Sequence, residues 1–297
     1  MADHDNQCLC GVNILYSMLI VIGFLLYGCQ TLGSKSDVIA QDLVAATHWK
    51  TRNIRTRNFL LRSYLAPLVV RRKHPPLYIY IEGDGFAWRH ANQPSLDPTP
   101  RNPVALRLAL GHSSERAEEG VTYLARPCQY NLVQDKKRCS NRFWTDARFS
   151  AKVIEAMDEA VDDLKKTAQA TSLKLIGYSG GGAVAVLLAA RRTDVERLIT
   201  VASPLETETW ARINQLTPMS ASLNPADHID AVRHLPQIHF VGGQDPVVRP
   251  AVVQAFAERF GKDGERLIHI ESDFDHTCCW EQEWPRLLSL ALQAKGP

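Results

Sequence analysis

Residues 173–192 read LKLIGYSGGGAVAVLLAARR, and this stretch decides the fold of the chain. Its first four residues, LKLI, are mostly apolar and favour a buried strand, and residues 183–192 favour a helix. Between them, residues 177–181 fit the pattern G-x-S-x-G, which places Ser179 on a sharp turn from strand to helix. There the hydroxyl is lifted off the sheet, and the amide of Gly180 points to where an oxyanion would form. A flexible glycine turn is the alternative, but the flanking strand and helix favour a nucleophile.

The composition is that of an ordinary globular protein. The 297 residues are 45% hydrophobic and 22% charged, with a formal net charge of +2. This length suits one α/β domain with a short N-terminal addition. Such a charge balance does not predict a nucleic-acid partner, which would favour a strongly basic face. The sequence contains no phosphate-binding loop and no dinucleotide fingerprint, so no cofactor is predicted.

The N-terminus predicts export. Residues 14–28 are almost wholly apolar, and their length matches the hydrophobic region of a signal peptide. They end in LYGC at residues 26–29, which resembles the lipobox of a bacterial lipoprotein with Cys29 as the lipidated residue. An uncleaved N-terminal anchor is the alternative, because the first seven residues contain two aspartates and no lysine or arginine. Incorporation of labelled palmitate would distinguish the two.

Three segments follow from this pattern: residues 1–29 as signal peptide or anchor, 30–50 as a tether, and 51–297 as the folded domain. Either form of the N-terminus attaches the domain to a membrane outside the cytoplasm. The lipobox and Gln30 together resemble a sorting signal for the periplasmic face of a bacterial outer membrane.

The cysteines agree with an oxidising compartment. Four remain after the export segment: Cys128, Cys139, Cys278 and Cys279. An even number outside the cytoplasm predicts disulfides. Cys128 and Cys139 bracket a polar loop, and closing it would contribute roughly 3 kcal/mol in the chain-entropy model. The adjacent Cys278 and Cys279 either form a vicinal disulfide or remain two small apolar side chains, and the sequence leaves both open.

Strands alternate with helices along the rest of the chain. Residues 77–81, LYIYI, predict a central strand that ends at EGDG, residues 82–85. Further strands are expected in a hairpin within 51–70 and at 121–124, 197–202, 238–241 and 267–270. Helices are expected at 37–46, 104–110, 149–171, 250–260 and 284–293, and irregular segments at 86–103 and 206–233. This alternation predicts a mostly parallel sheet covered on both faces, with the site at the carboxyl ends of its strands.

A serine nucleophile needs a base, and the base needs an orienting acid. The order serine, acid, histidine restricts the search to residues after Ser179. Asp245 is the predicted acid because it directly follows an apolar strand, in the turn GGQDP. Asp227 and Asp230 are the alternatives, but they lie in a polar connection with no strand before them.

The predicted base is His276, in the loop DFDH after the last strand. His269 lies within that strand and is expected to pack instead. A metal site at residues 273–279, which contain aspartate, histidine and cysteine, is not predicted, because no second ligand group at zinc spacing accompanies them. The oxyanion hole should use the amide of Gly180 and one from the EGDG loop, with Asp84 as first choice and Gly85 as second.

These motifs make the chain similar to the α/β-hydrolase superfamily from residue 77 to the C-terminus. The resemblance rests on GYSGG at 177–181, GGQDPVV at 242–248 and the late His276. EGDG stands where many members have His-Gly-x-Gly, so Glu82 replaces the histidine. The resemblance implies hydrolysis of an ester, thioester or amide through an acyl-enzyme. His276 would move the proton and Asp245 would hold the imidazole.

The sequence therefore predicts an exported serine hydrolase, a carboxylic esterase acting on a small-molecule or lipid-like acyl substrate. Two alternatives stay open: a non-catalytic binding lipoprotein on the same scaffold, since fold does not fix function, and an acyltransferase or peptidase with the same triad. The segments 86–103 and 206–233 are expected to shape the pocket. Candidate apolar lining residues are Trp88, Trp144 and Trp210.

Overall fold

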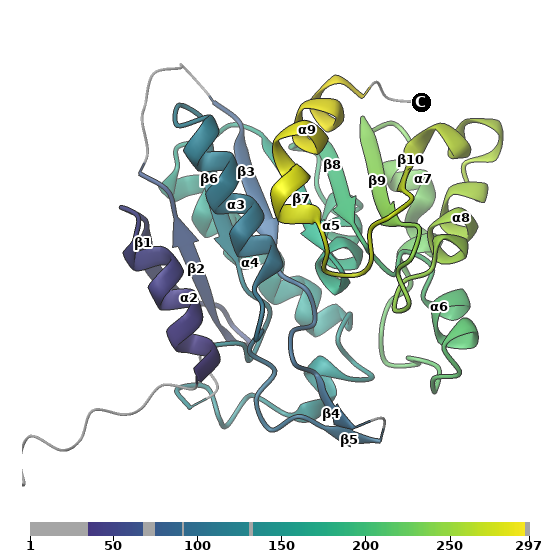
Figure 1. Ribbon diagram of the computed structural model, residues 1–297. Coiled ribbons are helices and arrows are strands. Elements are labelled where there is room, and N and C mark those ends of the chain that lie inside the picture. Colours follow the sequence, from purple (N-terminus) through teal and green to yellow (C-terminus); the bar gives the residue numbers. More distant parts are fainter. Residues whose placement is uncertain (1–34, 68–74, 91, 131–132, 295–297) are drawn as a thin grey trace, which may run out of the picture. The chain divides into compact units, whose positions relative to one another are not determined.

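The computed structural model describes residues 35–67, 75–90, 92–130 and 133–294. Within these ranges, the framework is a sheet with the strand order β1-β2-β6-β3-β7-β8-β9-β10 (Figure 1). Its strands are β1 Lys50–Arg55, β2 Leu60–Leu65, β3 Leu77–Ile81, β6 Gly120–Leu124, β7 Leu173–Tyr178, β8 Val195–Val201, β9 Gln237–Gly242 and β10 Ile268–Glu271. The pairs β1–β2 and β2–β6 are antiparallel, and all other neighbours are parallel. The predicted mostly parallel sheet is confirmed.

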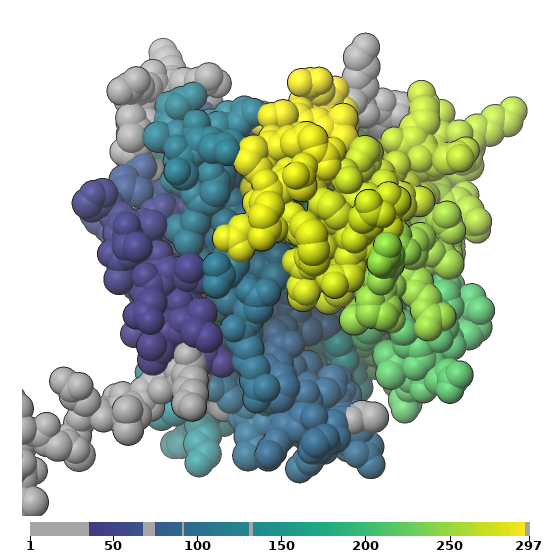
Figure 2. All heavy atoms as spheres, in the orientation of Figure 1, coloured from purple at the N-terminus to yellow at the C-terminus, as the bar shows by residue number. Residues whose placement is uncertain are grey.

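Helices cover both faces of this sheet. One face packs against α2 Lys35–Ala45, α3 Val104–Glu115 and α9 Trp280–Gln293. The other packs against α4 Ala151–Thr167, α5 Gly180–Ala189 and α8 Pro250–Glu258. On the first face α3 and α9 lie side by side, as both the ribbon and the space-filling view show (Figure 1, Figure 2).

Strand β3 explains why the central strands are apolar along their whole length. Leu77, Ile79 and Ile81 enter the core shared with α4 and α5. Tyr78 and Tyr80 enter the core shared with α3 and α9. Because side chains alternate between the two faces of a sheet, a strand covered on both sides must be apolar at every position.

The segment 206–233 is more regular than its polar sequence predicts. It contains the helices α6 Thr207–Ile213, η2 Pro225–His228 and α7 Ile229–Val232. Its polar residues cap these helices: Glu206 accepts a hydrogen bond from the amide of Thr209 (2.6 Å), and Asn224 caps the start of η2. Side chains that satisfy the first free amides of a helix favour its formation, and a hydrophobic pattern does not show this.

Two other elements differ from their expected bounds. The segment 86–103 contains a small ribbon of β4 Trp88–His90 and β5 Gln93–Pro94. The last helix begins at Trp280 instead of residue 284. Trp280 and Trp284 are four residues apart and both buried, so they lie on the same helical face and extend it into the core.

Helix α2 lies in the segment predicted as a tether. Its Ala40 and Val44 are buried in the core, so the folded domain includes residues before 51. The predicted signal segment 1–29, with Cys29, lies outside the described residues. None of the helices in the described part of the chain has the length and apolar character needed to cross a membrane.

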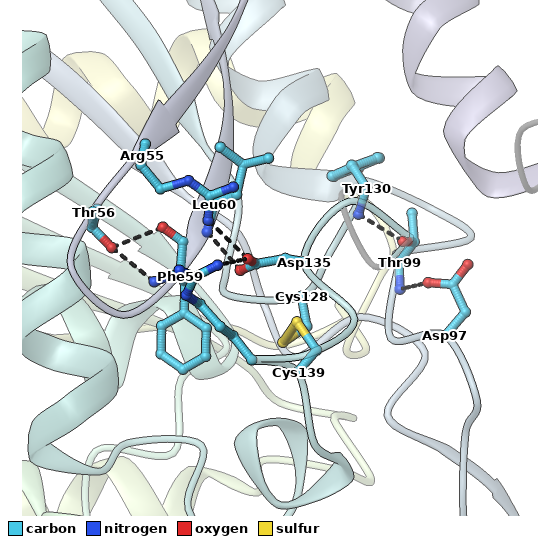
Figure 3. The surroundings of a disulfide bond; sticks show 11 residues. Arg55, Thr56, Phe59, Leu60, Asp97, Thr99, Cys128, Tyr130, Asp135 and Cys139 are labelled. Atoms are coloured by element: carbon cyan, nitrogen blue, oxygen red, sulfur yellow. Dashed lines mark hydrogen bonds and ion pairs between the residues drawn. A yellow bond between two sulfur atoms is a disulfide. The ribbon is translucent and has the colours of Figure 1, made fainter.

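Cys128 and Cys139 form the predicted disulfide (Figure 3). The loop between them is tied to the β1–β2 hairpin by the buried Asp135, which accepts from Arg55 Nη1 (2.8 Å) and from the amide of Leu60 (2.7 Å). The disulfide and these bonds hold a polar loop against the edge of the sheet. Cys278 and Cys279, which the sequence left open, also form a disulfide.

Candidate active site

Ser179 occupies a strained turn between β7 and α5. Its backbone has φ +50° and ψ −128°, a left-handed conformation that is uncommon for a residue with a side chain. The turn is tight because glycines allow the backbones to approach. A Cβ on Gly177 would lie 2.3 Å from the carbonyl oxygen of Gly181, and one on Gly181 would lie 2.2 Å from that of Ile81. The glycine spacing of the motif is therefore a packing requirement.

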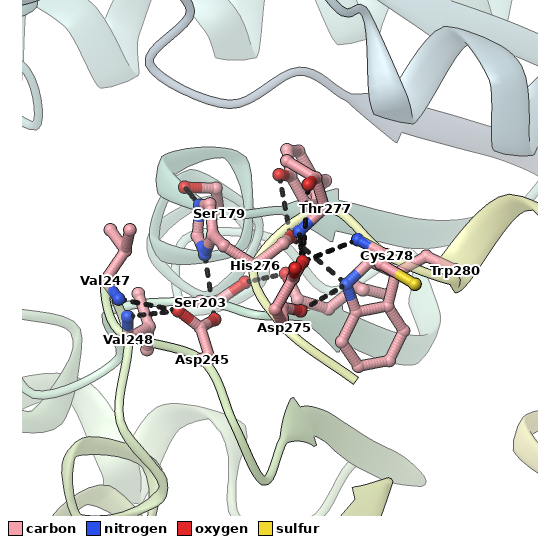
Figure 4. A network of polar contacts seen from close by, with 12 residues as sticks. Ser179, Ser203, Asp245, Val247, Val248, Asp275, His276, Thr277, Cys278 and Trp280 are labelled. Carbon is pink, nitrogen blue, oxygen red and sulfur yellow. Dashed lines mark hydrogen bonds and ion pairs between the residues drawn. The ribbon is translucent and has the colours of Figure 1, made fainter. Parts of the chain in front are cut away.

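The structure brings Ser179, His276 and Asp245 together from three strand ends (Figure 4). His276 Nε2 lies 3.1 Å from Ser179 Oγ, and His276 Nδ1 lies 2.8 Å from Asp245 Oδ2. Asp245 is 2% exposed, and its Oδ1 accepts from the amides of Val247 (2.7 Å) and Val248 (2.8 Å). A carboxylate accepts hydrogen bonds, so Nδ1 of His276 carries the proton and Nε2 accepts from the serine hydroxyl.

The loop that carries His276 is fixed by hydrogen bonds of its own. The carbonyl of His276 accepts from Tyr178 Oη (3.0 Å) and Trp280 Nε1 (3.1 Å). Asp275 Oδ1 accepts from the amides of Thr277 and Cys278, each at 2.7 Å. The orientation of the imidazole therefore depends on its loop as well as on Asp245.

Backbone amides for an oxyanion lie in two places. Gly180 opens α5, where free amides and the positive end of the helix dipole favour negative charge. In the EGDG loop, the amide of Gly83 donates to Glu82 Oε1 (2.9 Å), and the carbonyl of Gly83 accepts from Gln129 Nε2 (2.9 Å). In a trans peptide the next N–H points away from that carbonyl, so the Asp84 amide faces away from Gln129. Neither Asp84 nor Gly85 donates its amide to an acceptor among the described residues.

The side chain of Asp84 belongs to a buried charge cluster. Its Oδ2 accepts from Arg148 Nη1 (2.6 Å) and its Oδ1 from Arg126 Nη1 (3.3 Å). The side chains of Arg126 and Arg148 are 4% and 6% exposed. Burial lowers the pKa of Arg126 to about 10, and the charge of Asp84 opposes this shift. A Cβ on Gly180 would lie 2.1 Å from Asp84 Oδ1, so the cluster directly adjoins the nucleophile turn.

Glu82, the residue before this loop, is buried within the same region. It is 1% exposed, and its Oε2 has no hydrogen-bond partner among the described residues. Burial raises the pKa of Glu82 to about 7, and the bond from the amide of Gly83 opposes this shift. Because the folded-state pKa lies above the unfolded value, the stability linked to this proton is present at low pH and is lost as the pH rises from about 4.5 through 7.

We expect Glu82→Gln to remove this pH dependence. When the pH is raised from 5 to 8.5, the unfolding free energy of the variant minus that of wild type should increase by about 2–3 kcal/mol. Urea unfolding at both pH values measures the difference. The exposed Glu118→Gln is the control and should show no such gain. Equal pH profiles for wild type and Glu82→Gln would contradict the assignment.

A pocket of about 730 Å³ opens above Ser179 and His276. Its apolar lining consists chiefly of Phe86, Trp88, Trp210, Leu216, Met219, Val247 and Val248. Trp88 and Trp210 were expected there. Trp144, the third expected lining residue, is buried elsewhere in the core. The two segments expected to shape the pocket, 86–103 and 206–233, both contribute to its wall.

Sequence reasoning did not find Arg126 and Arg148. Arg148 lines the pocket, but no motif surrounds it, and its link to Asp84 spans 64 residues. The weaker candidates have other contacts in the structure. His269 Nε2 lies 2.9 Å from Glu271, and Asp227 lies 3.9 Å from Arg259 at the surface.

Comparison with known proteins identifies the family of the chain. Residues 112–274, more than half of the chain, match the family described as serine hydrolase (FSH1). No curated protein matches the chain in sequence.

Solved structures show the α/β-hydrolase fold. The Pyrococcus furiosus esterase Pf2001 is 15% identical, with a TM-score of 0.58 over 85% of this chain and 94% of that chain. Est1E from Butyrivibrio proteoclasticus is 15% identical, with a TM-score of 0.52 over 82% and 98%. An alpha-beta serine hydrolase homologue from Coxiella burnetii is 16% identical, with a TM-score of 0.53 over 83% and 97%.

Proposed function

The chain belongs to the FSH1 serine hydrolase family, and from this premise we propose that it cleaves carboxylic esters through an acyl-enzyme on Ser179. The observation that carries the proposal is the chain of contacts from Asp245 through His276 to Ser179 Oγ, at 2.8 and 3.1 Å. The apolar pocket above Ser179 supports an acyl substrate. One similar structure is that of a protein described as an esterase.

In this mechanism His276 takes the proton of Ser179 as the oxygen attacks the ester carbonyl. The resulting oxyanion accepts from the amides of Gly180 and Asp84. His276 then gives its proton to the departing alcohol, which leaves the acyl group on Ser179. A water molecule then attacks the acyl-enzyme: His276 takes its proton and returns one to Ser179 Oγ, and the carboxylic acid is released. Asp245 holds the imidazole in the tautomer that accepts at Nε2.

The alternatives use the same residues differently. Thioesters or amides would react through the same acyl-enzyme, and an acyltransferase would replace the water with another acceptor. A non-catalytic binding protein would have no need of the contact between His276 and Ser179. That contact is why we favour an enzyme.

The test is labelling of the full chain with a fluorophosphonate probe. We expect one stoichiometric adduct, located on the peptide that contains Ser179, and hydrolysis of short-chain ethyl esters that stops when the adduct forms. Absence of an adduct, or an adduct on another residue, would contradict the proposal. Adduct formation without hydrolysis of any ester, with transfer to an added alcohol or amine instead, would favour the acyltransferase.

A further inference from the structure

Arg148 has hydrogen-bonding capacity that the protein leaves unused. It lies between η1 Asn141–Trp144 and α4 and is 5% exposed, yet it lines the pocket. Its Nε donates to the carbonyl of Thr145 and its Nη1 to Asp84 Oδ2, both at 2.6 Å. Nη2 donates to no atom of the described residues, yet it is not fully buried and keeps some exposed surface. Because Arg148 lines the pocket, we take the two N–H groups of Nη2 to be available to a ligand there.

The charge around this group favours an anion. Asp84 is shared between Arg148 and Arg126, so two guanidinium groups face one carboxylate. Such a cluster keeps one positive charge in a buried setting, where charge interactions are stronger than in water. Arg101, a further lining residue, lies with its guanidinium carbon 3.4 Å from the centre of the Phe86 ring and has no acidic partner among the described residues.

The other acidic lining residues, Asp146 and Glu82, are respectively exposed beside an arginine and biased by burial toward the neutral form. The side chain of Asp146 is 49% exposed and lies 3.5 Å from Arg142. Glu82 is bonded to the amide of Gly83, and burial favours its neutral form by raising its pKa to about 7; when ionised, its charge acts on Arg126. An anion that enters the pocket therefore meets Arg148 and Arg101, and the carboxylate next to Arg148, that of Asp84, is already shared with Arg126.

Arg148 also lies close to the reacting centre. The carboxylate that it binds packs against the Cα of Gly180, next to Ser179. On its other side the guanidinium carbon lies 5.6 Å from the centre of the Trp210 ring, which belongs to the apolar wall. A short carbon chain could pack on this wall while its end reaches Nη2.

Building on the proposed esterase function, we propose that the substrate is an ester that carries a carboxylate a few atoms from its scissile bond, and that Arg148 binds this carboxylate through Nη2. Asp84 thus has two roles in the pocket: its amide faces the oxyanion, and its side chain orients Arg148. A charge-assisted hydrogen bond of this kind should favour an anionic ester over its neutral analogue roughly ten- to a hundredfold in kcat/KM.

The experiment compares matched pairs of esters with the full chain. Monoethyl succinate, glutarate and adipate place a carboxylate on the acyl side, and ethyl butanoate, pentanoate and hexanoate are their neutral counterparts. Butanoyl esters of glycolate and of 3-hydroxypropanoate, against ethyl and propyl butanoate, test the alcohol side. The readout is the ratio of kcat/KM for the charged ester to that for its neutral partner. We expect a ratio above ten for at least one length on one side.

Arg148→Met should reduce this ratio at least tenfold, while Arg148→Lys should retain part of it. A purely structural role would lower both rates and leave the ratio unchanged. Arg191→Met, at an exposed arginine that does not line the pocket, is the control and should keep the wild-type ratio. If Arg148→Met does not fold, the inference is tested on wild type alone, by the ratios above and by competitive inhibition of ethyl pentanoate hydrolysis by free glutarate. Wild-type ratios at or below one, or a ratio insensitive to Arg148→Met, would overturn the inference, whereas hydrolysis of no ester would overturn the proposed function.

Discussion

Ser179→Ala is expected to lower kcat by roughly 10⁴-fold or more, with the fold intact. Without the hydroxyl, no acyl-enzyme forms, and only direct attack by water on the bound ester remains. The backbone should accept alanine, because Ala202 already adopts φ +50° in the same sheet region. Ser179 Oγ bonds only to His276 among the described residues, so its loss leaves no buried carbonyl unpaired. Steady-state kinetics and a thermal melt measure the two effects separately.

Ser203→Ala is the matched control for this prediction. Ser203 is a fully buried serine near the same turn, and its Oγ donates to the carbonyl of Val201 (2.9 Å). Its replacement should change kcat by no more than a few fold. Should Ser179→Ala retain a tenth of wild-type activity, or still bind the fluorophosphonate at the same peptide, another residue would be the nucleophile.

The sequence was sufficient for the part of the site that local geometry dictates. The elbow at residues 177–181 can be predicted because Gly177 and Gly181 each remove a Cβ that would strike a specific backbone atom. Asp245 and His276 can be predicted because parallel strands end at one edge of the sheet, so polar residues that directly follow apolar strands converge there. These are constraints between neighbours in the chain or between elements whose order is known.

The cluster of Asp84, Arg126 and Arg148 could not be predicted, because it depends on contacts between residues far apart in the chain. Arg148 follows no strand end, and Arg126, although it comes two residues after β6, belongs to no recognisable motif; each would be expected on the surface by composition alone. Their burial depends on pairing with Asp84, which lies 42 and 64 residues away in sequence. Periodicity does not encode a contact of that kind. The helices of segment 206–233 were missed for a related reason, because capping by Glu206 and Asn224 outweighs their weak hydrophobic pattern.

Asp245→Asn is expected to lower kcat by roughly 10³- to 10⁴-fold while the fold and KM change little. Asparagine has nearly the same shape but a single oxygen. The amides of Val247 and Val248 both donate to Oδ1, so that oxygen should stay with them and the NH₂ group should face His276. Nδ1 would then have to accept, which moves the imidazole proton to Nε2. An Nε2–H donates to Ser179 instead of accepting from it, so the base is lost although every atom keeps its place.

Asp275→Asn separates this effect from damage to the histidine loop. Asp275 is also an aspartate whose Oδ1 accepts from two consecutive amides, but no bond joins it to the imidazole of His276. Its asparagine variant keeps the two amide bonds and leaves the tautomer of His276 unchanged, so kcat should fall by no more than about tenfold. Slow labelling by the fluorophosphonate in Asp245→Asn, with near-normal labelling in Asp275→Asn, would assign the loss to the proton on Nε2. An equal loss in both variants would instead mean that loop position controls the activity of Ser179, and the orienting role of Asp245 would have to be abandoned.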